Sequence, residues 1–128
     1  VLRGKPTSEV LFALQSHEIR RIARHEECVF VGRCADFVLH DQDVKLLTVF
    51  VAAPDEHRIR RKMEQEKLSR DQAVRLIRKM DKQRRKYYEN YTGRTWGAPD
   101  GYDLYLNTGS LSTDEAAACI AARFREMA

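Results

Sequence analysis

The run Leu46-Leu47-Thr48-Val49-Phe50-Val51-Ala52, followed by Ala53 and Pro54, decides the fold of this chain. Its residues are apolar or β-branched without alternation, which is typical of a strand that is covered on both faces, as in a parallel sheet. Pro54 suits the first turn of a helix, and we expect that helix to continue to about Lys67. A buried strand that leads directly into a helix indicates a layered α/β fold.

Strands and helices alternate on both sides of this run. Upstream, we expect a helix over residues 8–26, a short buried strand over Cys28–Val31 and a turn at Asp41–Asp43. Downstream, capping-box signatures at Ser69-x-x-Gln72 and Ser112-x-x-Glu115 predict helices that continue to about Tyr91 and Met127. Between them we expect an irregular loop, in which Trp96 and Tyr102 pack against the sheet, and a strand over residues 102–106. The length of 128 residues favours a single domain, residues 1–128.

Positive charge is concentrated in one segment. Thirteen of the 23 Lys and Arg residues lie between His57 and Lys86, where only Glu64, Glu66, Asp71 and Asp81 oppose them. This segment therefore carries about +9, whereas the whole chain carries a formal +4. Such a block indicates a partner with concentrated negative charge, which is a polymer, a membrane or the phosphates of a small ligand.

The composition narrows the class of protein. With 43% hydrophobic and 33% charged residues, the chain is expected to be soluble and globular. No apolar run approaches the length of a membrane span, so we expect no membrane partner. Cys28, Cys34 and Cys119 match neither a disulfide framework nor a zinc site, which favours a reducing cytoplasm and predicts no metal ligands.

The apolar stripe of the 69–91 helix is interrupted by charge. Val74, Ile77 and Tyr88 follow a three-four spacing, but the same stripe has Asp81 and Arg84 at two of its positions. One interpretation is a mutual Asp–Arg pair, worth about 0.2–0.5 kcal/mol on an exposed helix. The other is a polar cleft, in which Arg84 binds phosphate and Asp81 holds a sugar hydroxyl or orients the arginine.

The helix over residues 54–67 presents Arg58 and Arg61 one turn apart, with Ile59 and Met63 as its only clear apolar anchors. Because little apolar area holds it, we expect it to be mobile. A mobile, arginine-rich helix suits a lid, residues 54–70, that closes over transferring phosphates. A solvated basic face explains the same pattern equally well.

Gly32 and Arg33 directly follow the strand predicted over residues 28–31. Ligands of parallel sheets bind beyond the carboxyl ends of the strands, so Arg33 is a candidate for this crevice, and Asp36 could accept from an exocyclic amine. The alternative is an ordinary turn with a surface Arg–Asp pair. Cys34 is expected to be a packing residue, because no His or Asn pattern supports a cysteine enzyme.

Several short motifs occur in a particular order along the chain. They are Val31-Gly32-Arg33-Cys34-Ala35-Asp36, Val49-Phe50-Val51-Ala52-Ala53-Pro54, Arg58-Ile59-x-Arg61, Asp81-x-x-Arg84-x-x-Tyr87-Tyr88, Tyr91-Thr92-Gly93-Arg94-x-Trp96-Gly97, Tyr102-Asp103-Leu104 and Asn107-Thr108-Gly109-Ser110-Leu111. In this order and spacing, from about Leu11 to Met127, the chain resembles the cytidylate kinase-like family, a branch of the P-loop nucleoside monophosphate kinases.

The resemblance implies transfer of a phosphoryl group from ATP, with Mg²⁺, to CMP or dCMP. It implies that Arg33 grips the acceptor phosphate and that Asp36 lies near the cytosine, although ordinary cytidylate kinases have this aspartate directly after the arginine. It also implies roles for the remaining residues: Asp81 and Arg84 for the acceptor's ribose and phosphate, Arg58 and Arg61 for clamping the transferring group, and Asn107, Thr108 and Gly109 for the border of the ATP adenine.

The Gly-rich loop that cradles phosphates in this superfamily is missing from the sequence, and Gly4-Lys5-Pro6-Thr7 is a poor imitation of it. The expected fold is therefore a P-loop kinase-type three-layer parallel sheet with flanking helices, from which the P-loop strand is absent. In the related folds this strand lies between the strands expected over residues 28–31 and 46–52, so its absence leaves two strand edges unpaired, and we expect a longer protein or other copies of the chain to fill the gap. That the chain begins with Val1 rather than Met also suggests a fragment. The complete protein would be the kinase, and this chain alone would be inactive.

Two other functions remain open on the sequence. A nucleic-acid-binding module would use the basic helices on backbone phosphates, but no recognised binding motif accompanies them. The second is that of a non-catalytic relative of these kinases, which would bind nucleotide and serve a regulatory or assembly role.

Overall fold

The computed structural model describes residues 7–127 and divides into two compact units, Val1–Leu46 and Leu47–Ala128. The fold is a mostly helical α/β arrangement with one two-stranded parallel sheet among the described residues. Helices within the described part are α1 (Thr7–His25), α2 (Ala35–Leu39), α3 (Asp55–Glu66), α4 (Arg70–Thr92) and α5 (Thr113–Glu126), and the strands are β1 (Val49–Ala52) and β2 (Leu104–Asn107).

The first unit is built around a small apolar cluster between α1 and α2. Ile19 of α1 is buried with Ala35, Val38 and Leu39 of α2. Partly buried apolar side chains from α1 and from the segments on either side of α2 complete the cluster: Phe12, Ala23, Phe30, Val44 and Leu46. Helix α1 confirms the helix predicted over residues 8–26, whereas α2 was not predicted.

The strand predicted over Cys28–Val31 is wrong. These residues form no strand, and Val29 and Val31 are 89% and 90% exposed. A strand exists only when a second backbone accepts its hydrogen bonds, and no described segment does so here. Both parts of the prediction, the strand pairing and the burial, are therefore contradicted in the described structure.

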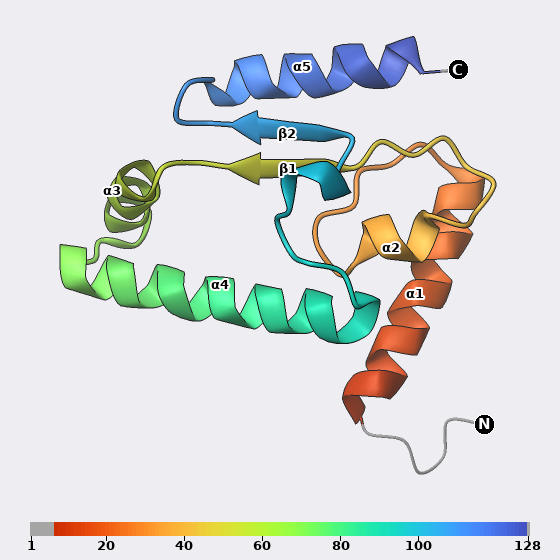
Figure 1. The fold of residues 1–128 in the computed structure, drawn as a ribbon, viewed down its shortest axis with the longest axis horizontal. Helices are drawn as coiled ribbons and strands as arrows, with labels where there is room; N and C mark the ends of the chain where they lie inside the picture. The colour runs from red at the N-terminus through yellow and green to blue at the C-terminus, as the bar shows by residue number, and fades with distance from the viewer. Residues whose placement is uncertain (1–6, 128) are drawn as a thin grey trace. The chain divides into compact units, whose positions relative to one another are not determined.

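The sheet of the second unit consists of β1 and β2, which run in parallel side by side (Figure 1). Their register pairs Val49 with Leu104 and Ala52 with Asn107. At the amino-terminal end of the pair, the backbone N–H and the hydroxyl of Thr48 both donate to Oδ2 of Asp103, at 2.9 and 3.0 Å. The N–H of Asp103 donates in return to Thr48 Oγ1 at 2.9 Å, so the strands are fastened where they begin.

The expected three-layer sheet is thus reduced to two strands in the described part of the chain. Strand β1 lies inside the predicted run 46–52, and β2 begins two residues later than predicted. Along β2, Leu104 and Leu106 are more buried than Tyr105 and Asn107, so successive side chains alternate between the two faces of the sheet.

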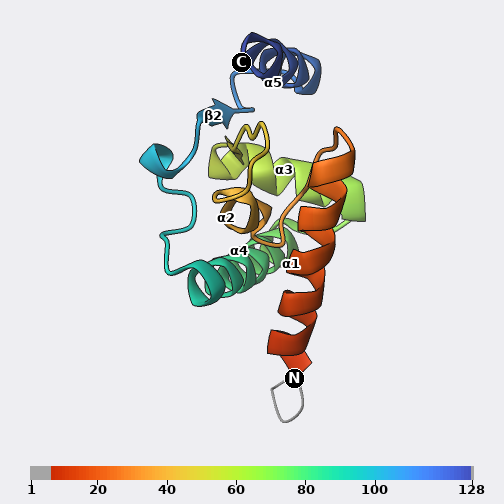
Figure 2. The same cartoon turned by 90° about the vertical axis from the view of Figure 1, so that its right-hand side faces the viewer.

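The helices of the second unit begin where the capping signatures predict. At the start of α4, the Ser69 side chain accepts from the N–H of Gln72 and the Gln72 side chain accepts from the N–H of Ser69. Ser112 and Glu115 make the same reciprocal pair at the start of α5. Helix α3 is seen end-on in Figure 1 and side-on in Figure 2, and α4 the reverse, so these two helices cross.

Aromatic side chains join the 93–103 loop to the sheet, as predicted. The ring of Phe50 on β1 lies 5.4 Å from that of Trp96, 5.1 Å from Tyr102 and 5.2 Å from Tyr105. A Cβ on Gly97 would lie 3.0 Å from the Phe50 ring, so glycine allows the loop to approach this closely. The loop includes the short 3-10 helix η1 (Pro99–Gly101).

Candidate functional site

The two parallel strands end at the same edge of the sheet, where each is followed by a segment with candidate site residues. Strand β1 continues through Ala53 and Pro54 into α3, and the N–H of Arg58 donates to the Pro54 carbonyl at 3.1 Å. Strand β2 continues into the loop Asn107–Gly109. The carboxyl edge of a parallel sheet is the usual place for a ligand in α/β proteins.

Hydrogen bonds fix the Asn107–Gly109 loop against the end of β1. The N–H of Thr108 donates to the Ala52 carbonyl at 2.8 Å, and the Thr108 hydroxyl donates to the same oxygen at 3.3 Å. Within the loop, the N–H of Gly109 donates to Asn107 Oδ1 at 2.8 Å. The loop is therefore held at the point where α3 begins.

A pocket of about 250 Å³ opens at this edge. Four of the predicted site residues line it: Arg58 and Arg61 from α3, Arg84 from α4 and Thr108 from the loop. The other lining residues are Val51, Ala52, Ala53, His57, Lys62, Gln65, Ile77 and Met80. Three predicted arginines that lie up to 26 positions apart in sequence thus share one concave site.

The pocket is lined by cations, and no described carboxylate lines it. Nζ of Lys62 lies 3.2 Å from Oε2 of Glu66, and Arg58 is paired with Asp81; neither of these two carboxylates lines the pocket. Arg61 and Arg84, by contrast, form no hydrogen bond or ion pair with any residue in 7–127. Two guanidinium groups are therefore available to an anionic ligand without breaking any contact.

Arg58 and Asp81 form a two-pronged ion pair between α3 and α4. Nη1 of Arg58 donates to Oδ2 of Asp81 at 2.8 Å, and Nη2 donates to Oδ1 at 2.6 Å. These hydrogen bonds raise the pKa of the Arg58 guanidinium. The interpretation that Asp81 pairs with Arg84, three positions along the same helix, is therefore wrong. Its partner comes from the neighbouring helix, which sequence spacing does not reveal.

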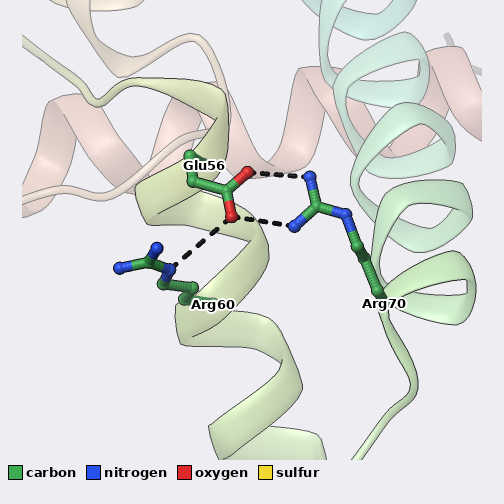
Figure 3. A network of polar contacts seen from close by, with 3 residues as sticks. All are labelled: Glu56, Arg60 and Arg70. Carbon is green, nitrogen blue, oxygen red and sulfur yellow. Dashed lines mark hydrogen bonds and ion pairs between the residues drawn. The ribbon is translucent and has the colours of Figure 1, made fainter.

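Ion pairs join α3 to α4, and no residue of α3 is fully buried. Figure 3 shows Glu56 of α3 between Arg70, at the start of α4, and Arg60 of its own helix. Arg70 donates to both Glu56 oxygens at 2.8 and 2.7 Å, and Nε of Arg60 lies 3.6 Å from Oε1. The hydrogen bonds from Arg70 lower the pKa of Glu56.

Arg33 and Asp36 lie in the first unit, Val1–Leu46, and not in the unit that carries this pocket. Arg33 lines a pocket of about 240 Å³ with mainly apolar neighbours, among them Ile19, Ile22 and Phe30. Gly32, Arg33 and Cys34 all have positive φ angles, of 74°, 57° and 57°. For a non-glycine residue this backbone conformation costs on the order of 1–3 kcal/mol. The turn that carries Arg33 is thus strained at two consecutive positions.

Cys34 is buried, as expected of a packing residue, and burial raises the pKa of its thiol to about 11, with a further contribution from Asp36. Cys28, Cys34 and Cys119 are all free thiols. Among residues 7–127, no three His, Cys, Asp or Glu side chains lie together as a metal site would require. Within the same residues, no helix is both long enough and apolar enough to cross a membrane.

Sequence reasoning missed three polar residues of the pocket: His57, Lys62 and Gln65. The spacing of these residues relative to Arg58 and Arg61 could have identified them. Positions 57 and 61, 58 and 62, and 61 and 65 are each four apart, so these side chains share one side of a helix that was already predicted. Two apolar residues of α4, Ile77 and Met80, also line the pocket. Ile77 was part of the predicted apolar stripe of this helix, and Met80 lies next to Asp81, which occupies a position of the same stripe.

Comparison with known proteins identifies a family and a similar crystal structure. Residues 2–110 match the cytidylate kinase-like family. A crystal structure of an uncharacterized protein from Eubacterium ventriosum ATCC 27560 is similar with a TM-score of 0.86 and 28% sequence identity, over 94% of this chain and 75% of that chain. No curated protein matches the sequence. Because the family match spans most of the chain and the aligned structure shares its fold, this chain belongs to the cytidylate kinase-like family.

Proposed function

We propose that the complete protein transfers a phosphoryl group from ATP to CMP or dCMP, and that this chain supplies the arginines that bind the acceptor and close over the reaction. The observation that carries the proposal is the pocket at the carboxyl edge of β1 and β2. There, Arg58, Arg61 and Arg84 meet beside the Asn107–Gly109 loop. A concave site with three arginines and no lining carboxylate among the described residues suits the phosphates of a small ligand.

Catalysis of phosphoryl transfer depends on position and charge more than on covalent chemistry. In the proposed reaction, Arg58 and Arg61 neutralise the charge that spreads over the oxygens of the transferring group. Because both project from α3, a movement of this one helix brings both to the ligand or withdraws both. Helix α3 follows β1 directly and has no buried side chain, which suits the lid role of residues 54–70.

The acceptor nucleotide is assigned to Arg84, Asp81, Arg33 and Asp36. Arg84 is exposed to the pocket and unpaired within residues 7–127, so its planar fork is free for the acceptor phosphate. Asp81 is assigned to the ribose hydroxyls. For Arg33, the strained turn from Gly32 to Cys34 is the supporting observation, since such strain gathers at ligand-binding positions. Asp36 is assigned to the exocyclic amine of cytosine.

The donor nucleotide is assigned to the loop Asn107, Thr108 and Gly109, which would border the adenine of ATP. This loop is held rigidly against β1 by Thr108, so it offers a fixed wall.

Residues 7–127 do not fit a Mg²⁺ site of their own, because the pocket is lined by cations and no acidic cluster among these residues accompanies it. No role in the reaction is therefore assigned to a protein-bound metal.

The complete protein is further proposed to have the P-loop kinase-type three-layer sheet. Its Gly-rich loop would supply the phosphate cradle that residues 1–128 do not contain. The parallel pair β1–β2 supports this proposal, because parallel strands are typical of such a sheet.

The direct test is phosphoryl transfer from ATP by the full-length protein, measured with CMP, dCMP, UMP and AMP as acceptors. The proposal expects product with CMP or dCMP at a higher kcat/KM than with AMP. Absence of transfer to every pyrimidine nucleotide, from protein shown to be folded, would overturn it.

A nucleic-acid role predicts a different outcome. Affinity for a duplex or a single strand would then fall steeply with salt, and substitution of any exposed arginine on α4 would weaken it similarly. The concave pocket favours the small ligand, because three arginines from two helices line one site of about 250 Å³.

A further inference from the structure

The carboxylate of Asp81 occupies the fork of Arg58 in this structure. Both terminal nitrogens of the guanidinium are used, at 2.8 and 2.6 Å, and the two side chains are 31% and 23% exposed. A phosphate binds the same two nitrogens with the same planar geometry. Arg58 therefore cannot give this end-on pair of N–H groups to a ligand phosphate while it remains paired with Asp81.

The cations of the pocket fall into two classes for this reason. Arg61 and Arg84 have no partner within residues 7–127 and meet a ligand without breaking any contact. Arg58 must first leave Asp81. A ligand with low charge is already neutralised by the two unpaired arginines, whereas a ligand with several phosphate charges gains more from a third.

We infer that Asp81 is a positioning residue that competes with ligand phosphates for Arg58, so that the pocket recruits its third arginine only for a highly charged polyphosphate. The inference rests on the proposed phosphate role of this pocket. It adds a role for Asp81 that differs from contact with the acceptor's ribose, because it acts through Arg58 and needs no sugar. It also gives α3 a defined resting position, held to α4 until a ligand replaces the carboxylate.

The inference is tested with inorganic tripolyphosphate, which has no sugar or base. Its affinity for the full-length protein is measured by calorimetry at fixed ionic strength, for the wild type and Asp81→Asn. We expect Asp81→Asn to bind tripolyphosphate about fivefold more tightly, the factor that corresponds to one partly exposed ion pair. The Asn side chain keeps the shape of Asp, and circular dichroism verifies that each variant is folded.

Two controls separate competition for Arg58 from a general change of charge. Asp71→Asn removes the same charge from an exposed position of the same helix, and we expect it to change the affinity by less than about twofold. In an Arg58→Ala background, Asp81→Asn should lose its effect, since the residue for which it competes is gone.

Unchanged or weaker tripolyphosphate binding by Asp81→Asn would overturn the inference. An equal gain in the Arg58→Ala background would do so too, because the effect would then be simple repulsion. The outcomes remain distinct from those of the kinase assay. If tripolyphosphate follows the expected pattern but no pyrimidine nucleotide is phosphorylated, the competition stands and the proposed reaction falls.

Discussion

Gly109 and Pro54 approach each other so closely that no side chain fits at position 109. A Cβ on Gly109 would lie 2.5 Å from Cδ and 2.9 Å from Cγ of the proline ring. The ring is rigid, and Pro54 is the residue that precedes the first turn of α3. The loop that follows β2 and the helix that follows β1 are therefore in direct contact through these two residues.

Gly109→Ala is expected to destabilise the protein by about 1–3 kcal/mol, the usual cost of overpacking a close contact. Relief of the clash would move either the Asn107–Gly109 loop or the start of α3. Equilibrium unfolding in urea measures the change. Gly101→Ala is the matched control, because a Cβ at position 101 meets nothing within 4 Å. A Gly109→Ala variant as stable as Gly101→Ala would show that the contact is absent in solution.

Asp103→Ala is expected to lower the free energy of unfolding by about 1–2 kcal/mol. The substitution removes the acceptor of both Thr48 hydrogen bonds and so unfastens the amino-terminal ends of β1 and β2. Asp100→Ala, in the same loop but without a carboxylate contact of this kind, should change the stability by less than about 0.5 kcal/mol. Equal effects of the two substitutions in thermal or urea unfolding would contradict the assignment.

Arg84→Ala is expected to weaken binding of CMP by about tenfold or more, since it removes a guanidinium from the pocket. Arg75→Ala removes the same side chain from an exposed position of the same helix that does not line the pocket. Its effect on CMP affinity should remain below about twofold. Calorimetric titration of the full-length protein compares the two, and similar losses would favour a solvated basic face over a binding site.

Structural features whose interacting residues lie close together in the sequence could be predicted, whereas features that depend on a distant segment could not. The capping boxes at Ser69 and Ser112 were predictable because both partners lie within three residues of each other. The strand at Cys28–Val31 was not, because a strand depends on a second segment that the run itself does not specify. Helix α2 was also missed. It begins after three residues with positive φ, and two of these are not glycine, the residue that usually marks such a conformation in a sequence.

The residues of the candidate site also differ in how much of their surroundings could be predicted from the sequence. Arg58, Arg61 and Arg84 could be predicted to share a site because the family resemblance assigns all three to phosphates, and the structure places all three in the lining of one pocket. The partner of Asp81 could not, because the crossing of α3 over α4 selects Arg58, 23 positions away, over Arg84 on the same helix. Spacing along one helix predicts neighbours within that helix and carries no information about a crossing helix.

Cys34 offers a test of the strained turn that carries Arg33. Its thiol is buried and its pKa is raised to about 11, whereas Cys28 and Cys119 are exposed. Since the thiolate is the reactive form, a pKa about two units above the ordinary value lowers its fraction at pH 8 by roughly a hundredfold. We therefore expect iodoacetamide to modify Cys28 and Cys119 at least about a hundredfold faster than Cys34, as measured by mass spectrometry of peptides.

The difference between the thiols should depend on pH and on folding in a definite direction. As the pH rises toward 11, Cys34 ionises and its rate should approach those of the exposed thiols, within the limit set by burial. In urea all three should react at similar rates, because the unfolded chain gives each thiol the same surroundings. Rapid modification of Cys34 in the folded protein at pH 8 would show that the turn from Gly32 to Cys34 opens readily, and the strained conformation would then not be the resting one.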